Sequence, residues 1–248
     1  MNGCAVVTGA SSGIGLAIAQ NLADAGYSVV NWDLRAPAAV DPRIPHVFCD
    51  VSQESAVKAA VTDTIARAGD IAVLVNNSGL QFMSSIEEFP VEKWQQLIGV
   101  MLTGTFLCTK FVWPSMKKLG RGRIVNISSV HGKLASPHKS AYVAAKHGVL
   151  GLAKVAAIEG APFGITVNTI CPGFVDTPLM RDQVKSQMVL HSLSEQDVLE
   201  RVFLKDQQIK KLTSPAQVAD FVRFLVSDTG ATITGEAFNI SGGWGMGL

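Results

Sequence analysis

A glycine-rich turn near the start of the chain constrains the fold more than any other feature. A short apolar run leads into TGASSGIG at residues 8–15, and a helix-like segment follows it. Gly9, Gly13 and Gly15 permit a tight turn, close approach of the backbone to a ligand, and close packing of helix on strand. Backbone N–H groups and the positive end of the helix would then face an anion such as a pyrophosphate. The pattern predicts a strand, a turn and a helix that bind a dinucleotide.

The next strand-like run favours NAD as that dinucleotide. Residues 27–32 are followed by Asp33, and an acidic residue at the end of the second strand would hydrogen-bond the adenosine ribose hydroxyls of NAD. The same carboxylate would repel the 2′-phosphate of NADP, and neither Ser11 nor Ser12 supplies a cation for that phosphate. Arg35 leaves NADP as a second possibility.

Strand-like and helix-like segments alternate along the rest of the chain. The run at 71–75 is unbroken and apolar, as expected for a strand buried on both faces of a parallel sheet. No internal repeat, low-complexity tract or linker interrupts the pattern. The expected fold is one doubly wound α/β domain over residues 1–248, with dinucleotide-binding and catalytic parts in the same unit.

Three other segments carry structural expectations. Residues 92–118 are expected to be largely helical, with an apolar stripe for the core or a subunit contact, and Pro114 is expected to kink or end this stretch. Residues 176–211 are irregular and rich in charge, and we interpret them as a mobile helical substrate lid, with a surface insertion as the alternative. Ser214 and Pro215 are expected to cap and start the final helix.

Composition narrows the class of partner. The net charge is +1 without a basic run, which argues against nucleic acid and anionic membranes. The four cysteines are far apart and indicate reduced thiols in a cytoplasmic protein. The five histidines include no spaced ligand set, so no metal site is expected, and we expect neither a signal peptide nor a membrane span. A small molecule is therefore the expected partner.

The candidate chemistry lies in RIVNISSVHGKLASPHKSAYVAAK at residues 123–146. Ser129 ends an apolar strand-like run, Tyr142 opens an alanine-rich helix, and Lys146 lies four residues further on, on the same helix face. A phenol with a pKa of ~10 is a poor base at neutral pH unless a cation stabilises its phenolate. Lys146 would supply that cation, and Ser129 would hold the oxygen on which Tyr142 acts. The alternative is a surface Tyr and Lys on an ordinary helix.

Taken together, these motifs resemble the short-chain dehydrogenase/reductase family. TGASSGIG at 8–15, NNSG at 76–79, the serine, YVAAK at 142–146 and PG at 172–173 have that family's order and spacing. The resemblance implies a Rossmann-type doubly wound sheet of about seven parallel strands with helices on both faces. It implies a homotetramer, and hydride transfer between a nicotinamide and a carbonyl or carbinol carbon.

The resemblance also implies roles for individual residues. Tyr142 would be the acid/base, Lys146 would hold the nicotinamide ribose and lower the pKa of Tyr142, and Ser129 would orient the substrate oxygen. Asp50 and Val51 are expected to line the adenine pocket, with helix capping as the alternative. The expected cofactor-binding residues are Gly9, Ser12, Gly13, Ile14, Gly15, Asp33, Asp50, Val51, Asn77, Gly79, Tyr142, Lys146, Pro172, Gly173 and Thr177.

Within the family, the segments at 86–94 and 129–149 are most similar to the bacterial (R)-3-hydroxybutyrate dehydrogenases. That resemblance implies an NAD-dependent enzyme that interconverts a short 3-hydroxy acid and its 3-oxo acid. A four-carbon acid offers little apolar area, so its affinity must come from charge-assisted hydrogen bonds to its carboxylate, with Lys139 as the cation. The expected substrate-binding residues are Gln81, Ser129, His131, Lys139, Tyr142, Gln183 and Trp244.

Two positions depart from the family pattern. Met101 stands where an Asn usually helps to hold a water linked to the catalytic lysine, and Phe174 stands where the most similar enzymes tend to carry Trp. Two alternatives therefore stay open. One is an NADPH-dependent reductase of 3-oxoacyl thioesters or other carbonyls, which would have little use for Lys139. The other is a dinucleotide-binding scaffold without catalysis.

Overall fold

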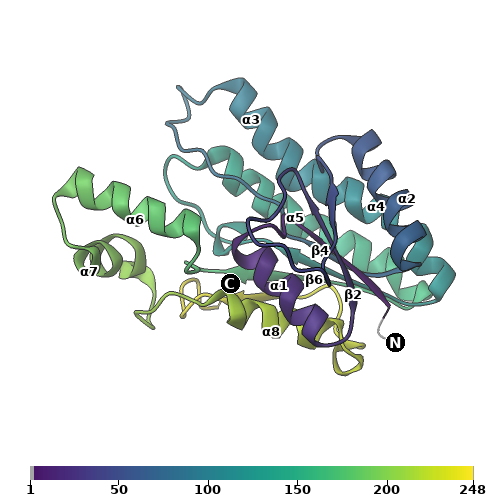
Figure 1. The fold of residues 1–248 in the computed structure, drawn as a ribbon. Helices are drawn as coiled ribbons and strands as arrows, with labels where there is room; N and C mark the ends of the chain where they lie inside the picture. The colour runs from purple at the N-terminus through teal and green to yellow at the C-terminus, as the bar shows by residue number, and fades with distance from the viewer. Residues whose placement is uncertain (1–2, 248) are drawn as a thin grey trace.

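Seven parallel strands form one sheet at the centre of the molecule (Figure 1). The computed structural model describes residues 3–247. The strand order is β3-β2-β1-β4-β5-β6-β7, and it reverses between β1 and β4, where such sheets open a ligand-binding crevice. The predicted doubly wound sheet of seven parallel strands is confirmed. The strands are β1 (Cys4–Thr8), β2 (Ser28–Asp33), β3 (His46–Phe48), β4 (Ile71–Asn76), β5 (Gly122–Ile127), β6 (Ile165–Pro172) and β7 (Ala237–Ile240).

Helices cover both faces of this sheet. The helices α2 (Glu54–Ala68), α4 (Gly104–Leu119) and α5 (Ser140–Gly160) pack on one face, and α1 (Gly13–Asp24) and α8 (Pro215–Val226) pack on the other. Alternate residues of β1 serve the two cores, because Val6 packs with the first set and Val7 with the second. Since both faces are buried, the central strands β1 and β4 are almost entirely apolar and do not alternate with polar residues.

The long helical stretch before β5 is interrupted but not ended. It comprises α3 (Val91–Ile98), a π-helical segment η1 (Gly99–Thr103), and α4. Pro114 lies inside α4, which continues to Leu119, so the expectation that this proline ends the helix is wrong. Pro114 is exposed, and water can therefore solvate the carbonyl that loses its helical partner.

The segment expected to be a lid is helical. It contains α6 (Pro178–His191), α7 (Glu195–Val198), the π-helical η4 (Leu199–Phe203) and the 3-10 turn η5 (Leu204–Asp206). Figure 1 shows α6 and α7 projecting from one side of the sheet. A small apolar cluster around Met180, Val184 and Val198 holds these helices together. The helical part of the prediction is confirmed, and the motion of the segment stays a prediction.

Short 3-10 turns complete the chain at η2 (Val130–Gly132), η3 (Ala161–Phe163) and η6 (Asp228–Gly230). The final helix begins as predicted: the Ser214 side chain and the Gln217 side chain form a reciprocal capping box, and Pro215 is the first helical residue. All four cysteines are buried and none is bridged.

Two helical stretches, Val91–Leu119 and Ser140–Phe163, are long and apolar enough to cross a membrane by length and composition alone. In the fold, both contribute side chains to the core beside the sheet. Core helices of water-soluble proteins pass the same test, so the two stretches are weak evidence for a membrane span.

Candidate active site

The glycine-rich turn joins β1 to α1 at the carboxyl edge of the sheet. Gly9 and Gly13 have positive φ angles of 66° and 57°, which favour glycine. A Cβ atom on Gly15 would lie 2.3 Å from the carbonyl oxygen of Gly9, so the first turn of α1 can pack on the strand only without a side chain there. The Asn77 carboxamide donates to the carbonyls of Thr8 and Gly9 at 3.0 and 3.1 Å. These hydrogen bonds fix the turn, and Asn77 also lines the cavity beside it.

Asp33 lies beside this turn at the end of β2. Its Oδ2 accepts from the Ser11 N–H at 3.1 Å and its Oδ1 from the Arg35 N–H at 3.0 Å. Each carboxylate oxygen keeps further lone pairs for a ligand hydroxyl. Two residues earlier, buried Asn31 accepts from the Ala10 N–H and donates to Ser11 Oγ, which ties the turn to β2. The predicted juxtaposition of turn and carboxylate is therefore present.

A cavity of about 760 Å³ opens above the turn. Its lining suits a dinucleotide, because it places glycine backbone at one part of the wall and the Asp33 carboxylate at another. Ten of the expected cofactor residues line it: Gly9, Ser12, Gly13, Ile14, Asp33, Asp50, Val51, Asn77, Gly79 and Thr177. Four others, Tyr142, Lys146, Pro172 and Gly173, line the adjoining cavity. Gly15 lines neither cavity and acts through helix–strand packing.

Asp50 and Val51 line the cofactor cavity, as one of the two interpretations requires. The helix α2 begins only at Glu54, and its N-cap, Gln53, makes no capping hydrogen bond through its side chain. Asp50 instead accepts from the backbone N–H and the hydroxyl of Ser52, at 2.9 and 2.7 Å. This turn directly after β3 shapes the cavity wall and does not cap the helix.

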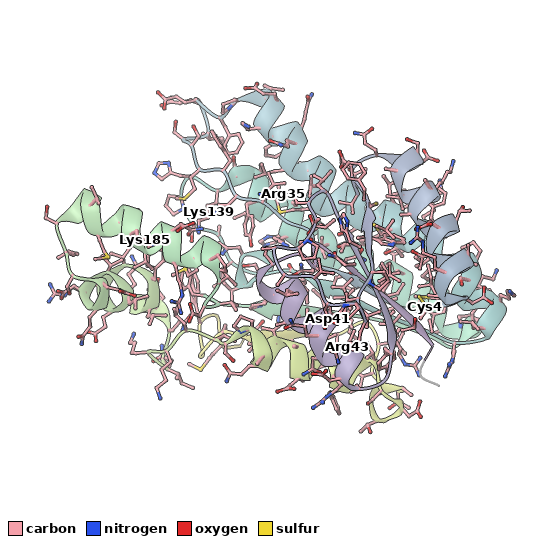
Figure 2. The ribbon with its side chains drawn as sticks, viewed as in Figure 1. Cys4, Arg35, Asp41, Arg43, Lys139 and Lys185 are labelled. Atoms are coloured by element: carbon pink, nitrogen blue, oxygen red, sulfur yellow. The ribbon has the colours of Figure 1, made fainter. Side chains whose placement is uncertain are left out.

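A second cavity of about 220 Å³ adjoins the first. All seven expected substrate-binding residues line it, although they come from five separate parts of the chain. Figure 2 shows Lys139 beside α6, and the same cavity is lined by Met180 and Gln183 of that helix. The expected residues in this lining are Gln81, Ser129, His131, Lys139, Tyr142, Gln183 and Trp244.

Ser129 and Tyr142 meet at the centre of this cavity. Ser129 follows β5 and caps the short turn η2, where its Oγ accepts from the His131 N–H at 3.1 Å. Tyr142 lies in the first turn of α5. Burial raises the pKa of Tyr142, and a hydrogen bond with the Ser129 side chain opposes that rise. Without a bound ligand, the phenol is therefore protonated at neutral pH.

Lys146 is buried one turn after Tyr142 on α5, as the spacing predicts. Its Nζ donates to the Ile127 carbonyl at 2.8 Å and lies 5.7 Å from the centre of the Tyr142 ring. Burial lowers the pKa of Lys146 to about 8, so the group is largely cationic at neutral pH. The pKa of Tyr142 is governed by burial and Ser129 in this state, and the expected lowering by Lys146 stays a prediction for the ligand-bound protein.

His131 is buried between polar and aromatic neighbours. Its Nδ1 lies 3.4 Å from Ser129 Oγ and its Nε2 lies 2.9 Å from Ser136 Oγ. Burial, reinforced by the charge of Lys139, lowers its pKa to about 4. The imidazole is therefore neutral at pH 7, and Lys139 is the cation of this lining besides Lys146, which lies one turn from Tyr142 on α5.

Aromatic rings close one side of the substrate cavity. Trp244 stacks on Phe174 with ring centres 5.2 Å apart and makes an edge contact with His131 at 5.3 Å. Phe174 also contacts Phe203 of the lid segment edge-on, at 5.2 Å. Phe174 thus connects the C-terminal turn to the lid segment and lines the cavity between them.

Met101 is fully buried in the π-helical segment, behind Tyr142. It packs with Leu97, Ala141 and Ala145, and its carbonyl accepts from Thr105 Oγ1 at 2.7 Å. The side chain offers no strong hydrogen-bonding group at this place. The cluster against which the Tyr142 ring packs is consequently apolar.

Several lining residues were not anticipated. Leu80, Val175 and Met180 complete the walls of the smaller cavity, and Gln95 and Gln96 of α3 reach the larger one. Gln95, Gln96 and Met180 reach the site only through the packing of α3 and α6, whereas Leu80 and Val175 lie in the loops after β4 and β6 beside residues that the motifs do mark. Within residues 3–247, no three His, Cys, Asp or Glu side chains gather in an arrangement suited to a metal ion.

Comparison with known proteins agrees with this geometry. The short chain dehydrogenase family matches residues 3–188. The chain is 43% identical to the D-beta-hydroxybutyrate dehydrogenase of Rhizobium meliloti (strain 1021), over 98% of this chain and 99% of that protein. It is 39% identical to the acetoacetyl-CoA reductase of the same organism, over 98% of both chains.

Two solved structures share the fold along almost the whole chain. The ligand-free aldohexose dehydrogenase of Thermoplasma acidophilum superposes with a TM-score of 0.91 at 34% identity, covering 98% of this chain and 93% of that one. A variant of the actinorhodin polyketide ketoreductase with NADPH gives 0.89 at 33% identity, covering 98% and 97%. The chain therefore belongs to the short-chain dehydrogenase/reductase family of oxidoreductases.

Proposed function

We propose that this oxidoreductase interconverts a short 3-hydroxy acid, such as (R)-3-hydroxybutyrate, and its 3-oxo acid, with NAD as cofactor. One observation carries the proposal: polar side chains from separate segments converge with Ser129 and Tyr142 on one cavity of about 220 Å³. That volume suits a molecule of a few heavy atoms. The similarity to a D-beta-hydroxybutyrate dehydrogenase supports the same substrate class.

The carboxylate would bind at the Lys139 side of the cavity. Burial lowers the pKa of Lys139, which indicates a cation that is partly removed from water. An anion restores the lost solvation, and charge-assisted hydrogen bonds are stronger than neutral ones. Gln81 and Gln183 supply neutral donors, and neutral His131 lines the same cavity without adding a second charge.

The residues around the substrate oxygen would carry out the proton transfer. A bound nicotinamide supplies the acceptor or donor of hydride. In the oxidation direction, the Tyr142 phenolate takes the hydroxyl proton of the substrate, while Ser129 hydrogen-bonds the same oxygen. Lys146, largely cationic, stabilises the phenolate electrostatically from the next turn of α5.

NAD is proposed over NADP because Asp33 lines the cofactor cavity beside the glycine-rich turn. A carboxylate there would accept from ribose hydroxyls and repel a 2′-phosphate. Arg35 also lines this cavity, and this favours the second candidate function, an NADPH-dependent reductase of 3-oxoacyl thioesters or other carbonyls. The 39% identity to an acetoacetyl-CoA reductase supports that alternative.

The decisive experiment measures NAD+ and NADP+ reduction with (R)-3-hydroxybutyrate, (S)-3-hydroxybutyrate and a neutral secondary alcohol. We expect NADH formation with one enantiomer. Lys139→Ala should lower kcat/KM for that acid about 10- to 100-fold, the value of a charge-assisted hydrogen bond, and leave the neutral alcohol unaffected. Lys185→Ala is the matched control, because Lys185 is an exposed lysine of α6 that pairs with Asp182 outside the cavity.

The outcomes separate the candidates. Equal losses for acid and neutral alcohol in Lys139→Ala would rule out the carboxylate site. Turnover only with NADPH and a 3-oxoacyl thioester would favour the second candidate. If the protein binds cofactor but turns over no substrate, and Tyr142→Phe behaves like wild type, the non-catalytic scaffold is favoured.

We also propose a homotetramer in the cytoplasm. Large apolar side chains on the helices beside the sheet are exposed in the single chain, including Phe106, Val155 and Ile158. Such a patch supports burial against another subunit. Four buried, unbridged cysteines support a reducing compartment.

A further inference from the structure

A line of three hydrogen-bonding side chains leads from Tyr142 to the outside of the protein. The Ser129 side chain bonds Tyr142, Ser129 Oγ lies 3.4 Å from His131 Nδ1, and His131 Nε2 lies 2.9 Å from Ser136 Oγ. Ser136 is half-buried and lines a separate, open hollow formed by the loop after η2 and the start of α5. The proposed mechanism uses Ser129 and Tyr142 but assigns nothing to Ser136.

Counting protons sets the direction of these hydrogen bonds. Ser129 has one hydroxyl proton, and when Tyr142 is a phenolate that proton must point to the phenolate oxygen. Ser129 Oγ is then an acceptor for its other neighbours, which include the His131 backbone N–H at 3.1 Å. His131 is neutral and has one ring proton, which must lie on Nδ1 to donate to Ser129. Nε2 is left as an acceptor, and the neighbour placed to donate to it is the Ser136 hydroxyl.

We propose that Ser136 is a positioning residue for Tyr142: by donating to His131 Nε2 it holds the ring proton on Nδ1, so that His131 and Ser129 both donate toward the phenolate. This inference rests on the proposed acid/base role of Tyr142. Hydrogen bonds arranged head to tail polarise one another, so the outermost donor strengthens the innermost one. Without Ser136, the ring proton is free to move to Nε2, and Nδ1 then competes with the phenolate for the Ser129 proton.

On the side of the loop after β5, Ser129, His131 and Ser136 provide the hydrogen bonds that support Tyr142. Behind the ring lie Met101, Ala141 and Ala145, which offer no side-chain donor. The titratable side chains around these three residues are two lysines, a histidine and a cysteine. Lys139 and His147 act on His131, Lys146 lies one turn along α5 from Tyr142, and Cys171 of β6 lies beside Lys146. None of these groups replaces the hydroxyl that Ser136 presents to Nε2.

The chain allows a direct test, because it contains only two tyrosines, Tyr27 and Tyr142. In a Tyr27→Phe background, ionisation of Tyr142 can be followed alone, by phenolate absorbance or by the NMR signal of a labelled ring carbon. We expect Ser136→Ala to raise the pKa of Tyr142 by about half a unit. Ser136→Thr, which keeps the hydroxyl, should restore the original value.

Ser140→Ala is the matched control. Ser140 lines the same outer hollow and lies two residues before Tyr142. Its buried Oγ nevertheless has no hydrogen-bond partner. Its loss should leave the titration of Tyr142 unchanged. An unchanged pKa in Ser136→Ala, or an equal shift in Ser140→Ala, would overturn the proposal. Circular dichroism and melting curves establish that each variant is folded.

A second measurement connects the line to turnover. The acid limb of the pH profile of kcat/KM should move to higher pH in Ser136→Ala and return in Ser136→Thr, with the KM for cofactor unchanged. The titration needs no substrate, so a failure of the hydroxy-acid assay leaves it valid and tests only the proposed function. A Tyr142 titration that does not respond to Ser136 contradicts the inference even when the hydroxy-acid assay succeeds.

Discussion

Burial has shifted the pKa of every ionisable side chain at the centre of the candidate site. It raises the pKa of Tyr142 and lowers those of Lys146, Lys139 and His131, in each case against the charged form. The free protein therefore holds a neutral phenol and a neutral imidazole beside two lysines whose pKa values are lowered by burial. Ligands that bring compensating charge have the most to gain from binding there, which is consistent with an anionic substrate.

His131 makes folding stability depend on pH. Its pKa falls from an ordinary 6.5 to about 4 in the folded chain, so the unfolded state binds more protons between these values. The free energy of unfolding should be fully retained above pH 6.5 and should decrease by up to about 3 kcal/mol as the pH falls to 4.

Urea unfolding at several pH values measures this decrease. His131→Gln keeps a hydrogen-bonding side chain but does not titrate, and it should flatten the curve between pH 4 and 6.5. Depressed carboxylates such as Asp70 and Asp176 titrate below this window, so they do not mimic the effect. An unchanged slope in the variant would show that another group is responsible.

Among the elements, α5 and the π-helical segment η1 organise the chemistry. Helix α5 places Tyr142 and Lys146 one turn apart, and Ser128 Oγ anchors it by donating to the Lys146 carbonyl at 3.0 Å. The extra residue in the turn of η1 accompanies Met101, whose side chain packs against the buried face of α5. Such π-helical turns often occur at functional sites, and here the segment contributes Met101 to the apolar cluster behind Tyr142.

Met101→Asn tests whether Met101 stabilises the fold through the apolar cluster behind Tyr142 or limits the rate of catalysis. We expect the amide to lower the free energy of unfolding by about 2 kcal/mol, because it enters an apolar cluster at a position that is 1% exposed. Met101→Leu, the volume-matched control, should cost less than about 1.5 kcal/mol.

Thermal or urea unfolding measures the cost, and kcat measured in parallel tests catalysis. Met101→Asn should leave kcat within about threefold, since Lys146 and Ser129 already have polar partners. A large rise in kcat with unchanged stability would instead mean that Met101 impairs the proton path, as the scaffold alternative requires.

For the whole molecule, one sheet determines where both cavities lie. The strand order reverses between β1 and β4, and the loops after β1, β4, β5 and β6 all contribute residues to the two cavities. The helices on the outside leave apolar residues uncovered, with Ile158 of α5 exposed at 76%. The single chain therefore carries both cavities and an exposed apolar surface, which the proposed homotetramer would bury.

Ile158→Glu tests that surface. Burying an unpaired carboxylate in an apolar contact should weaken assembly on the order of 100-fold. Light scattering coupled to size exclusion should then report a smaller species than wild type at micromolar concentration. Val40→Glu is the control, because Val40 is 82% exposed in a loop away from these helices. Identical masses for wild type and Ile158→Glu would exclude α5 from the subunit contact.

The order of strands and helices, the glycine-rich turn and the pairing of Tyr142 with Lys146 could all be predicted from the sequence. Each depends on contacts between residues close in the chain, such as the four-residue helical spacing and the steric freedom of Gly9 and Gly13. The polar residues of the second cavity could be named only through resemblance to relatives, because Gln81, Lys139 and Gln183 have no local pattern that marks a site.

Tertiary structure decided the rest. Packing brings α6 over the cavity and so adds Met180, it lets α4 continue past Pro114, and it places Ser136 against His131. Burial then moves the pKa of His131 to about 4, a value that no sequence spacing encodes. Local sequence determines backbone geometry through short-range sterics, whereas desolvation and the convergence of distant side chains exist only once the chain has folded.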